Sequence, residues 1–472
     1  MPSKTTTQAT TWSHQSSQPP HQTRLIKFQN CSALQPDGSL VDNFCLFVDP
    51  STGKIVDGQH AFYAQSIGFT QVVDLGGHLL SPGFIDVQIN GAYGIDFSSF
   101  DESDETYHLA AKNYLAKLDE FSKKILATGV TSFVPTIITQ KASSYRKILP
   151  LLSPRSRKGQ AHSLGYHAEG PFLSPDKRGA HCVKLIREAP RGIEDIEEVY
   201  GKGESGLDMQ GAVKILTLAP DVRGVMEAIP ELAKRGVIIS LGHTNSDLTT
   251  ALRAKEKGAS FITHLFNAME SFRHRDPGVI GLLGDSDEID FEDESGMTED
   301  SPWNGGGTKS NEGGKLSKKP RPYYGLITDG QHSHPCSVRM AYSCHPEGCV
   351  LTSDAMPWMD PEKPDGIYDW RENQRVVKKG YQVTLEGTTT LAGSVVPMDA
   401  CVRGLSRFAS IPLHTAAKCA STHPSRMLGL DKIKGVLQPG ADADLVVLDK
   451  KTGAVLSTWI LGEKAWQRGG DA

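Results

Sequence analysis

The chain has 472 residues, a formal net charge of −5 and a sequence pI of about 6.4. Hydrophobic residues make up 38% of it and charged residues 22%, which is somewhat polar for a globular protein. This charge gives no basic field for nucleic acid, and no run of about 18 apolar residues is present to cross a membrane. We therefore expect neither a nucleic-acid partner nor a membrane partner.

Residues 1–23 are rich in Thr, Ser, Gln and Pro and lack the apolar segment of a secretory signal. Basic residues are too sparse there for a transit peptide, so the composition predicts a disordered leader. The chain has eight cysteines without the spacing of a disulfide framework. They indicate buried thiols in a reducing compartment, and we expect a cytoplasmic protein.

The two ends of the chain share one character. Residues 24–80 alternate apolar and polar side chains, with turn signals between short strands such as Asn43–Val48. Residues 430–470 repeat this pattern, with apolar runs at Ala443–Leu448 and Val455–Leu461. We interpret both ends as parts of one small β domain.

The middle of the chain, residues 81–429, alternates short apolar runs with helical patterns such as Asp104–Ala127 and Val222–Lys234. Such alternation indicates βα units and a parallel sheet. The eight candidate strands are Gly83–Val87, Thr131–Pro135, Ser163–His167, Val213–Leu218, Val237–Leu241, Ser260–Thr263, Tyr324–Thr328 and Cys349–Ser353. The fold class is therefore α/β, and eight units predict a (β/α)₈ TIM-type barrel.

One segment interrupts this pattern. Residues 285–322 carry an acidic cluster, a Gly-Gly-Gly run and then several basic residues, with almost no periodic apolar content. This composition predicts a disordered insertion between the sixth and seventh strands. An acidic metal site is the alternative, but a solvated loop fits the composition better.

Polar residues follow most of the candidate strands, and in a barrel the carboxyl ends of the strands form one face, where active sites lie. Glu169, His243 and His264 offer one carboxylate and two imidazoles, a donor set suited to a divalent metal ion such as zinc. Three protein ligands leave a position open for water, and Asp354 is placed to move that water's proton.

Each of these residues also has a structural interpretation. A single histidine after a strand is usually a core or capping residue, Glu169 could lie at a helix N-terminus, and Asp354 could be an ordinary N-cap. Joint placement at four strand ends favours the metal site.

The chain resembles the N-acetylglucosamine-6-phosphate deacetylases of the amidohydrolase superfamily, over Leu25 to Arg468 without the insertion. The matching motifs are Pro82–Gly91, His167–Phe172, Lys177–His181, Gly242–Thr244, Thr263–Met269, Arg275–Gly278, Asp329–His332, Thr352–Ala355, Leu391–Ser394 and Pro439–Asp444. The narrow assignment depends on His-Ala-Glu-Gly-Pro-Phe, Gly-Ala-His, Asn-Ala-Met and Asp-Gly-x-His occurring together in this order.

The resemblance implies the function and the site. It implies deacetylation of N-acetylglucosamine-6-phosphate to glucosamine-6-phosphate and acetate in amino-sugar catabolism, with Glu169, His243 and His264 as metal ligands. Asp354 and His332 resemble the catalytic residues. The substrate-binding positions that it implies are Ala180, His181, Asn267, Ala268, His274, Arg275, His332 and Leu391. It also implies a homodimer, in which a phosphate contact such as Arg275 can come from the partner subunit.

One departure from the wider superfamily concerns the first strand. Many members have His-x-His at its end, whereas this chain has Gln88 and Asn90. Amides are poor zinc ligands, so we expect one divalent ion, zinc by preference, with a second site weak or absent. Whether Gln88 orients water or only packs stays open.

Two alternatives remain. The chain could be an amidohydrolase for another N-acyl substrate, or a non-catalytic amidohydrolase-like scaffold. Scaffolds of this kind lose their ligands, whereas all four polar residues at the strand ends are present here.

Overall fold

The computed structural model of this chain describes residues 23–58, 67–100, 106–202, 212–285, 319–371 and 374–469. Within these residues, eight parallel strands follow one another around a barrel in chain order, and the short strand β9 (His162–Ser163) adds to its side. The barrel strands are β5 (Phe84–Ile89), β8 (Val130–Ile138), β10 (Tyr166–Glu169), β11 (Val213–Leu218), β12 (Ile238–Leu241), β13 (Ala259–Ile262), β14 (Tyr323–Leu326) and β15 (Cys349–Leu351). The predicted (β/α)₈ barrel is confirmed.

The first and last strands of the barrel meet through the residues beside them. At one end, the backbone N–H of Ile85 donates to Ala420 and that of Leu351 donates to Cys419. At the other end, the N–H of Asp354 donates to the carbonyl of Gln88 at 2.8 Å. The barrel therefore closes next to the loop that carries Asp354.

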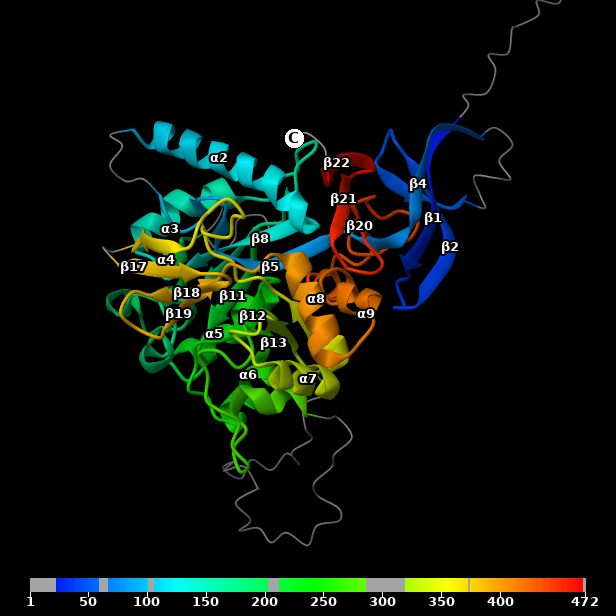
Figure 1. The fold of residues 1–472 in the computed structure, drawn as a ribbon. Coiled ribbons are helices and arrows are strands. Elements are labelled where there is room, and N and C mark those ends of the chain that lie inside the picture. Colours follow the sequence, from blue (N-terminus) through cyan, green and yellow to red (C-terminus); the bar gives the residue numbers. More distant parts are fainter. Residues whose placement is uncertain are drawn as a thin grey trace, which may run out of the picture.

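Helices surround the barrel (Figure 1). They are α2 (Tyr107–Lys124), α3 (Ala142–Ile148), α4 (Ile193–Tyr200), α5 (Val225–Lys234), α6 (Leu248–Lys257), α7 (Pro335–Cys344), α8 (Met398–Ala409), α9 (Leu413–Lys418) and α10 (Thr422–Met427). α5 shows why such segments are helical: Val225, Ile229 and Leu232 recur at the spacing of one helix face, and all three are buried. α2 and α5 lie within the two ranges where the sequence predicts helices.

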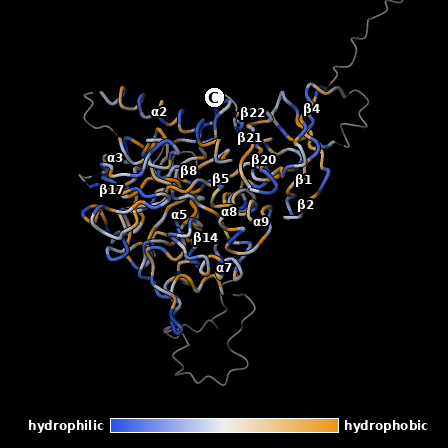
Figure 2. The backbone as a smooth tube through the Cα atoms, in the orientation of Figure 1, coloured by the Kyte–Doolittle hydropathy of each residue, from blue (hydrophilic) through white to orange (hydrophobic). Residues whose placement is uncertain are grey.

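Figure 2 shows hydrophobic backbone concentrated around β5 and β8, in the middle of the molecule. Every residue of β5 is buried, as is expected of a parallel strand covered on both faces. The polar members of this strand, Asp86 and Gln88, are therefore buried inside the barrel, at 1% and 0% exposure.

Strands from both ends of the chain form one further sheet, in the order β22-β21-β20-β4-β1-β2-β3 within the described residues. Their bounds are β1 (Thr23–Leu34), β2 (Leu40–Asp49), β3 (Lys54–Val56), β4 (Ile67–Pro82), β20 (Leu445–Leu448), β21 (Val455–Ile460) and β22 (Glu463–Gln467). In Figure 1 the blue N-terminal strands and the red C-terminal strands lie side by side. The two ends therefore share a sheet, as the sequence predicts, while the exact domain boundaries stay a prediction.

A small antiparallel sheet in the second half of the barrel region was not predicted. It contains β16 (Gly366–Asp369), β17 (Arg375–Lys379), β18 (Gln382–Leu385) and β19 (Leu391–Ser394). The bridge between Ala355 and Ser394 joins its last strand to the loop after β15. This sheet brings Leu391 to the mouth of the barrel.

Two predictions fall on residues that are not described. The predicted leader covers residues 1–23, of which only Thr23, the first residue of β1, is described. Most of the predicted insertion, residues 286–318, also lies outside the described residues. No helix among the described residues is long and apolar enough to cross a membrane.

A buried ion-pair network joins the terminal sheet to the barrel. The ammonium of Lys434 lies 2.5 Å from Asp444, 2.8 Å from Asp442 and 2.9 Å from Nδ1 of His162, the first residue of β9. Burial disfavours the charge of Lys434, but the two carboxylates raise its pKa above the ordinary value. Although His162, Asp442 and Asp444 also have the proximity of metal ligands, the ammonium already provides their positive charge.

We predict that Lys434→Met lowers the free energy of unfolding by about 3–5 kcal/mol, because it leaves the buried carboxylate of Asp444 without a cation, while Asp442 keeps its ion pair with Lys54. Urea denaturation followed by circular dichroism measures the change. The matched control is Lys432→Met, since Lys432 is exposed two residues earlier. An equal shift of the unfolding midpoint in both variants would contradict the proposed stabilisation by this network.

Candidate functional site

The four polar residues predicted at strand ends lie together at one rim of the barrel. Glu169 is the last residue of β10, and His243 and His264 each come two residues after a strand, β12 and β13. Asp354 comes three residues after β15. All four are buried, at 2%, 5%, 5% and 8% exposure.

The backbone is strained where three of these residues leave their strands. His243, His264 and Asp354 have positive φ angles of 50°, 29° and 47°. Residues other than glycine adopt such angles uncommonly, and they do so preferentially at functional sites. The strained turns direct the three side chains into the barrel mouth.

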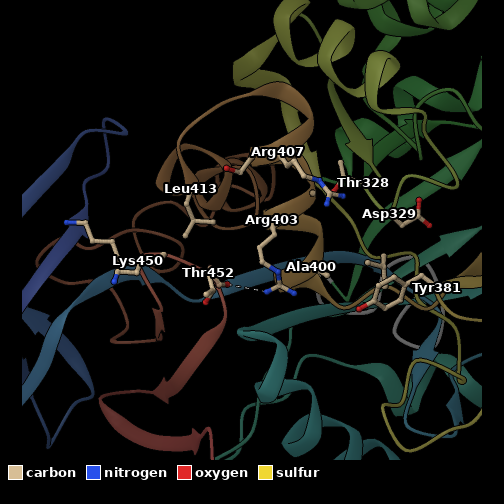
Figure 3. Close-up of a pocket in the computed structure, with 14 residues that line it drawn as sticks. Thr328, Asp329, Tyr381, Ala400, Arg403, Arg407, Leu413, Lys450 and Thr452 are labelled. Carbon is tan, nitrogen blue, oxygen red and sulfur yellow. Dashed lines mark hydrogen bonds between the residues drawn. The ribbon is translucent and has the colours of Figure 1, made fainter.

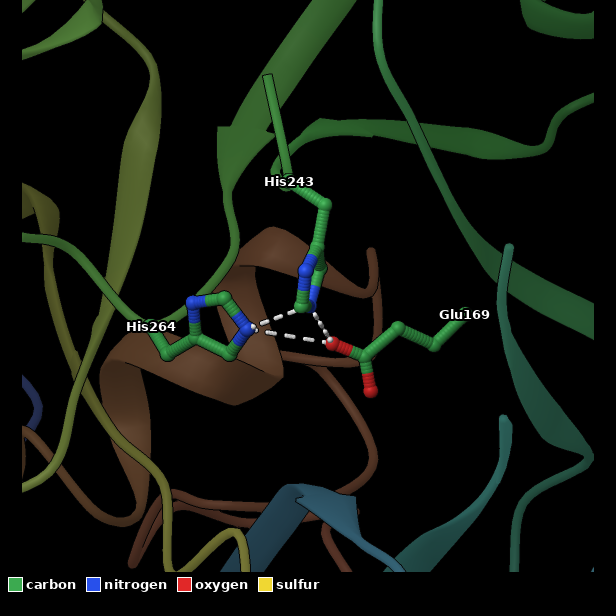
Figure 4. A group of neighbouring side chains, drawn as sticks. All are labelled: Glu169, His243 and His264. Carbon is green, nitrogen blue, oxygen red and sulfur yellow. Dashed lines mark hydrogen bonds and ion pairs between the residues drawn. The ribbon is translucent and has the colours of Figure 1, made fainter. Parts of the chain in front are cut away.

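Glu169, His243 and His264 converge on one point (Figure 4). Oε1 of Glu169 lies 3.1 Å from Nε2 of His243 and 3.1 Å from Nε2 of His264. The two Nε2 atoms are 3.0 Å apart. Ligand atoms at about 2.0–2.1 Å around a tetrahedral zinc ion are about 3.3–3.4 Å apart, so the three donor atoms fit a single cation after shifts of a few tenths of an ångström.

The hydrogen bonds around these donors also fit a cation. Nδ1 of His243 lies 2.7 Å from the carbonyl oxygen of Lys177, so its N–H donates there and Nε2 keeps a free lone pair. One proton on Nε2 of His264 can serve only one neighbour at a time, whereas a divalent ion would satisfy all three donor atoms. This group therefore forms the candidate metal site.

The charges in this group support one another. Burial opposes the charge of Glu169, but the adjacent imidazoles of His243 and His264 hold the pKa of its carboxyl well below the usual range. Burial likewise opposes protonation of His264, yet the hydrogen bond with Glu169 raises its pKa. The site thus keeps a carboxylate ionised in a buried place.

Asp354 lies beside this group and is held by amides from β5 and the residue that follows it. Nδ2 of Asn90 donates to Oδ1 of Asp354 at 2.7 Å, and Nε2 of Gln88 lies 3.4 Å from the same oxygen. Gln88 also lies 3.4 Å from Oε1 of Glu169, so its amide connects the two carboxylates. Burial and the charge of Glu169 raise the pKa of Asp354 to about 6. A carboxyl with such a pKa can both accept and return a proton near neutral pH.

A second carboxyl, that of Asp86, fixes the loop that carries Asp354. Asp86 accepts hydrogen bonds from the hydroxyl and from the backbone N–H of Ser353. Burial raises the pKa of Asp86 to about 7. Because Ser353 directly precedes Asp354, this contact fixes the orientation of the loop across the barrel.

His332 is oriented by Asp329 at the end of β14. Its Nδ1 lies 2.7 Å from Oδ2 of Asp329, whose other oxygen accepts the backbone N–H groups of Gln331 and His332. Burial opposes the charge of Asp329, but His332 lowers the pKa of its carboxyl. The arrangement presents Nε2 of His332 to the barrel mouth.

A cavity of about 490 Å³ opens over these side chains. All but two of the predicted site residues line it. Those that do are Glu169, Ala180, His181, His243, His264, Asn267, Ala268, His332, Asp354 and Leu391. Thr139 fixes His181 through a contact of 2.8 Å at Nδ1, and burial together with His243 lowers the pKa of His181 to about 3. His181 is therefore a neutral imidazole beside the candidate metal site.

His274 and Arg275 are the two exceptions. Both are exposed in the loop between β13 and β14 and do not line the cavity of their own chain. Their contact with substrate phosphate stays a prediction.

Three residues that support the site were given no role by the sequence interpretation: Asp86, Asp329 and Trp370. Asp86 had a detectable signal, because it is the one charged residue in the buried strand β5. Asp329 lies in the motif Asp329–His332, in which only the histidine was assigned a role. Trp370 had no signal, since it reaches the cavity only through the unpredicted small sheet.

Comparisons with known proteins agree with this geometry. Residues 389–465 match the amidohydrolase family. The N-acetylglucosamine-6-phosphate deacetylase of Bos taurus is 38% identical over 94% of this chain and 96% of its own length. Two solved structures are also similar: the enzyme of that name from Pasteurella multocida and the one from Mycobacterium smegmatis in complex with N-acetyl-D-glucosamine-6-phosphate.

The Pasteurella structure has a TM-score of 0.72 at 25% identity and covers 93% of this chain and 99% of its own. The Mycobacterium structure has a TM-score of 0.70 at 26% identity and covers 94% and 99%. Likeness at this level extends over both the barrel and the terminal sheet. The chain therefore belongs to the N-acetylglucosamine-6-phosphate deacetylase family.

Proposed function

We propose that the chain hydrolyses the acetamide of N-acetylglucosamine-6-phosphate, giving glucosamine-6-phosphate and acetate in amino-sugar catabolism. The single observation that carries this proposal is the convergence of Glu169, His243 and His264 beside Asp354, within the cavity. Family membership supports the choice of substrate.

Glu169, His243 and His264 would hold one divalent cation, and the carboxylate and imidazole donors favour zinc. When bound, such an ion polarises an amide carbonyl and lowers the pKa of water to about 7. The amide nitrogens of Gln88 and Asn90 face the carboxylates of Glu169 and Asp354, and amides are poor ligands for zinc, so any second site would be weak.

Asp354 would accept the proton of the attacking water and then return it to the departing amine nitrogen. Asn90 orients its carboxyl for both transfers. His332, fixed by Asp329, would polarise the carbonyl oxygen through Nε2 as negative charge develops there.

The rest of the cavity would bind the sugar. His181, Asn267 and Ala268 lie around the metal site and Leu391 forms an apolar wall suited to the acetyl methyl group. Arg275 and His274 would contact the phosphate across a homodimer interface, which their exposure away from their own cavity supports. A guanidinium suits this contact because its N–H groups match phosphate oxygens.

A cytoplasmic location is also part of the proposal. All eight cysteines are free, and several of them are buried. Unpaired thiols are typical of proteins in a reducing compartment.

The first prediction concerns the substrate. We expect acetate release from N-acetylglucosamine-6-phosphate after reconstitution with metal. Release from N-acetylglucosamine should be far slower, because this sugar lacks the phosphate that Arg275 and His274 would contact. The C4 epimer of the sugar phosphate and N-acetyl amino acids complete the panel. Faster turnover of any other member would favour an amidohydrolase for another N-acyl substrate, and no turnover at all would favour a scaffold.

The second prediction concerns Asp354. We expect Asp354→Asn to lower kcat by about 10²–10⁴-fold, the range for loss of general acid–base catalysis, while the bound metal is retained. Steady-state assays and metal analysis of the same sample check this. Asp369→Asn, an exposed carboxylate change on β16, should leave kcat unchanged. Near-normal turnover of Asp354→Asn would exclude the proposed acid/base.

The third prediction concerns the ligands. Wild-type protein should carry about one divalent ion per chain, as three-ligand catalytic sites do, and His264→Ala should carry only a small fraction of that. Elemental analysis after dialysis measures the content, with His108→Ala on the exposed face of α2 as the control. The assignment of His264 fails if the content of its variant matches that of the control.

A further inference from the structure

A second cavity lies between α8 and the turn that follows β20. It has a volume of about 530 Å³, and Figure 3 shows side chains from α8, from this turn and from the end of β14 around it. None of the proposed substrate or metal residues lines it. The proposed deacetylation therefore gives this cavity no role.

The cavity wall is rich in positive charge. Its charged lining residues are Asp329, Arg403, Arg407, Lys450 and Lys451. The carboxylate of Asp329 already accepts hydrogen bonds from His332 and from two backbone N–H groups. It is therefore poorly placed to neutralise the four cations.

Two of the cations are already engaged. Arg403 donates to Asp399 at 2.6 Å and to the carbonyl of Gly453 at 3.2 Å, which ties α8 to the turn. Lys450 donates to Ser32 at 2.9 Å, towards the terminal sheet. Both contacts hold the shape of the cavity.

Among the described residues, the other two cations have no such partner. The guanidinium of Arg407 lies 4.8 Å from the ring centre of Phe408, and no ion pair involves Arg407 or Lys451 in the part of the chain that the structure describes. Arg407 follows Arg403 by one helical turn, so both project from the same side of α8. The hydroxyl of Tyr381 and the side chain of Thr452 add neutral polar groups to the wall.

We propose that this cavity binds a phosphoryl group of a second small molecule, separate from the substrate. Arginine pairs with phosphate through two parallel N–H groups, and a lysine on the same cavity wall adds a point charge. The volume exceeds that of a phosphate ion, so a phosphomonoester of the size of a sugar phosphate fits this site.

Binding there is connected to the active cavity by residues 327–332. Ile327 and His332 line the active cavity, whereas Thr328 and Asp329 line the second one. α8 packs directly on this segment: a Cβ at Gly404 would lie 2.2 Å from the carbonyl oxygen of Thr328. A ligand that pulls on α8 therefore acts on Asp329, which orients His332, and we expect it to change kcat more than KM.

The test is titration calorimetry of the metal-loaded, full-length protein with inorganic phosphate and, separately, with glucosamine-6-phosphate, at constant ionic strength. In Arg407→Gln/Lys451→Gln we expect one class of binding site to weaken by about tenfold, as loss of charged hydrogen bonds predicts. Ligand bound in the active cavity is common to both proteins, so the difference reports the second site. Weaker binding of both ligands shows that the phosphoryl group alone is recognised. Weaker binding of the sugar phosphate alone shows that the site recognises the sugar as well.

The matched control is Lys112→Gln/Lys117→Gln, which removes the same charge from the exposed face of α2. It should bind both ligands as the wild type does. Steady-state kinetics give the second readout: phosphate should lower kcat of the wild type and of the control, and should act only on KM in Arg407→Gln/Lys451→Gln. Unchanged binding in that double variant, or an equal loss in the control, would overturn the proposal.

Discussion

The structure depends on bringing one carboxylate and two imidazoles to a single buried point. Glu169, His243 and His264 lie at the ends of three separate strands, yet their donor atoms are 3.0–3.1 Å apart. Polar atoms are costly to bury unless their hydrogen-bonding or coordination needs are met. The barrel meets this constraint with parallel strands whose carboxyl ends open on one face.

A layer of buried hydrogen bonds around these side chains keeps the arrangement rigid. Asn90 donates a hydrogen bond to Asp354, and Asp86 accepts one from Ser353, the residue before Asp354. Asp329 contacts Nδ1 of His332 in the same way. The contacts of Asn90 and Asp86 join β5 and the residue after it to the loop after β15, so they also stabilise the place where the barrel closes. Positive φ angles at His243, His264 and Asp354 show that this rigidity is used to maintain strained turns.

The sequence predicted the barrel well because its strands are short, apolar and separated by helices with clear periodicity. The candidate metal site followed from the same pattern, since parallel strand ends must share a face. Trp370 and the sheet from β16 to β19 were missed, because exposed strands such as Arg375–Lys379 lack a continuous apolar run. No pattern in one chain shows where Arg275 would meet a phosphate, since that prediction involves a second subunit.

The two cavities differ in how far the sequence alone could predict them. The active cavity is defined by residues that the barrel must bring together, whereas the cavity beside α8 depends on packing between the barrel and the turn after β20. Only the first could be anticipated from strand order. Different residues of the segment 327–332 line the two cavities, which makes this segment the connection between binding and catalysis.

The central claim is that Glu169, His243 and His264 share one divalent ion next to Asp354. Anomalous diffraction from crystals of the metal-loaded protein, recorded at the absorption edge of the metal, tests it most directly. The account predicts one strong peak within about 2.0–2.3 Å of Oε1 of Glu169 and of both Nε2 atoms. A peak elsewhere in the chain, or none between these three side chains, would contradict it.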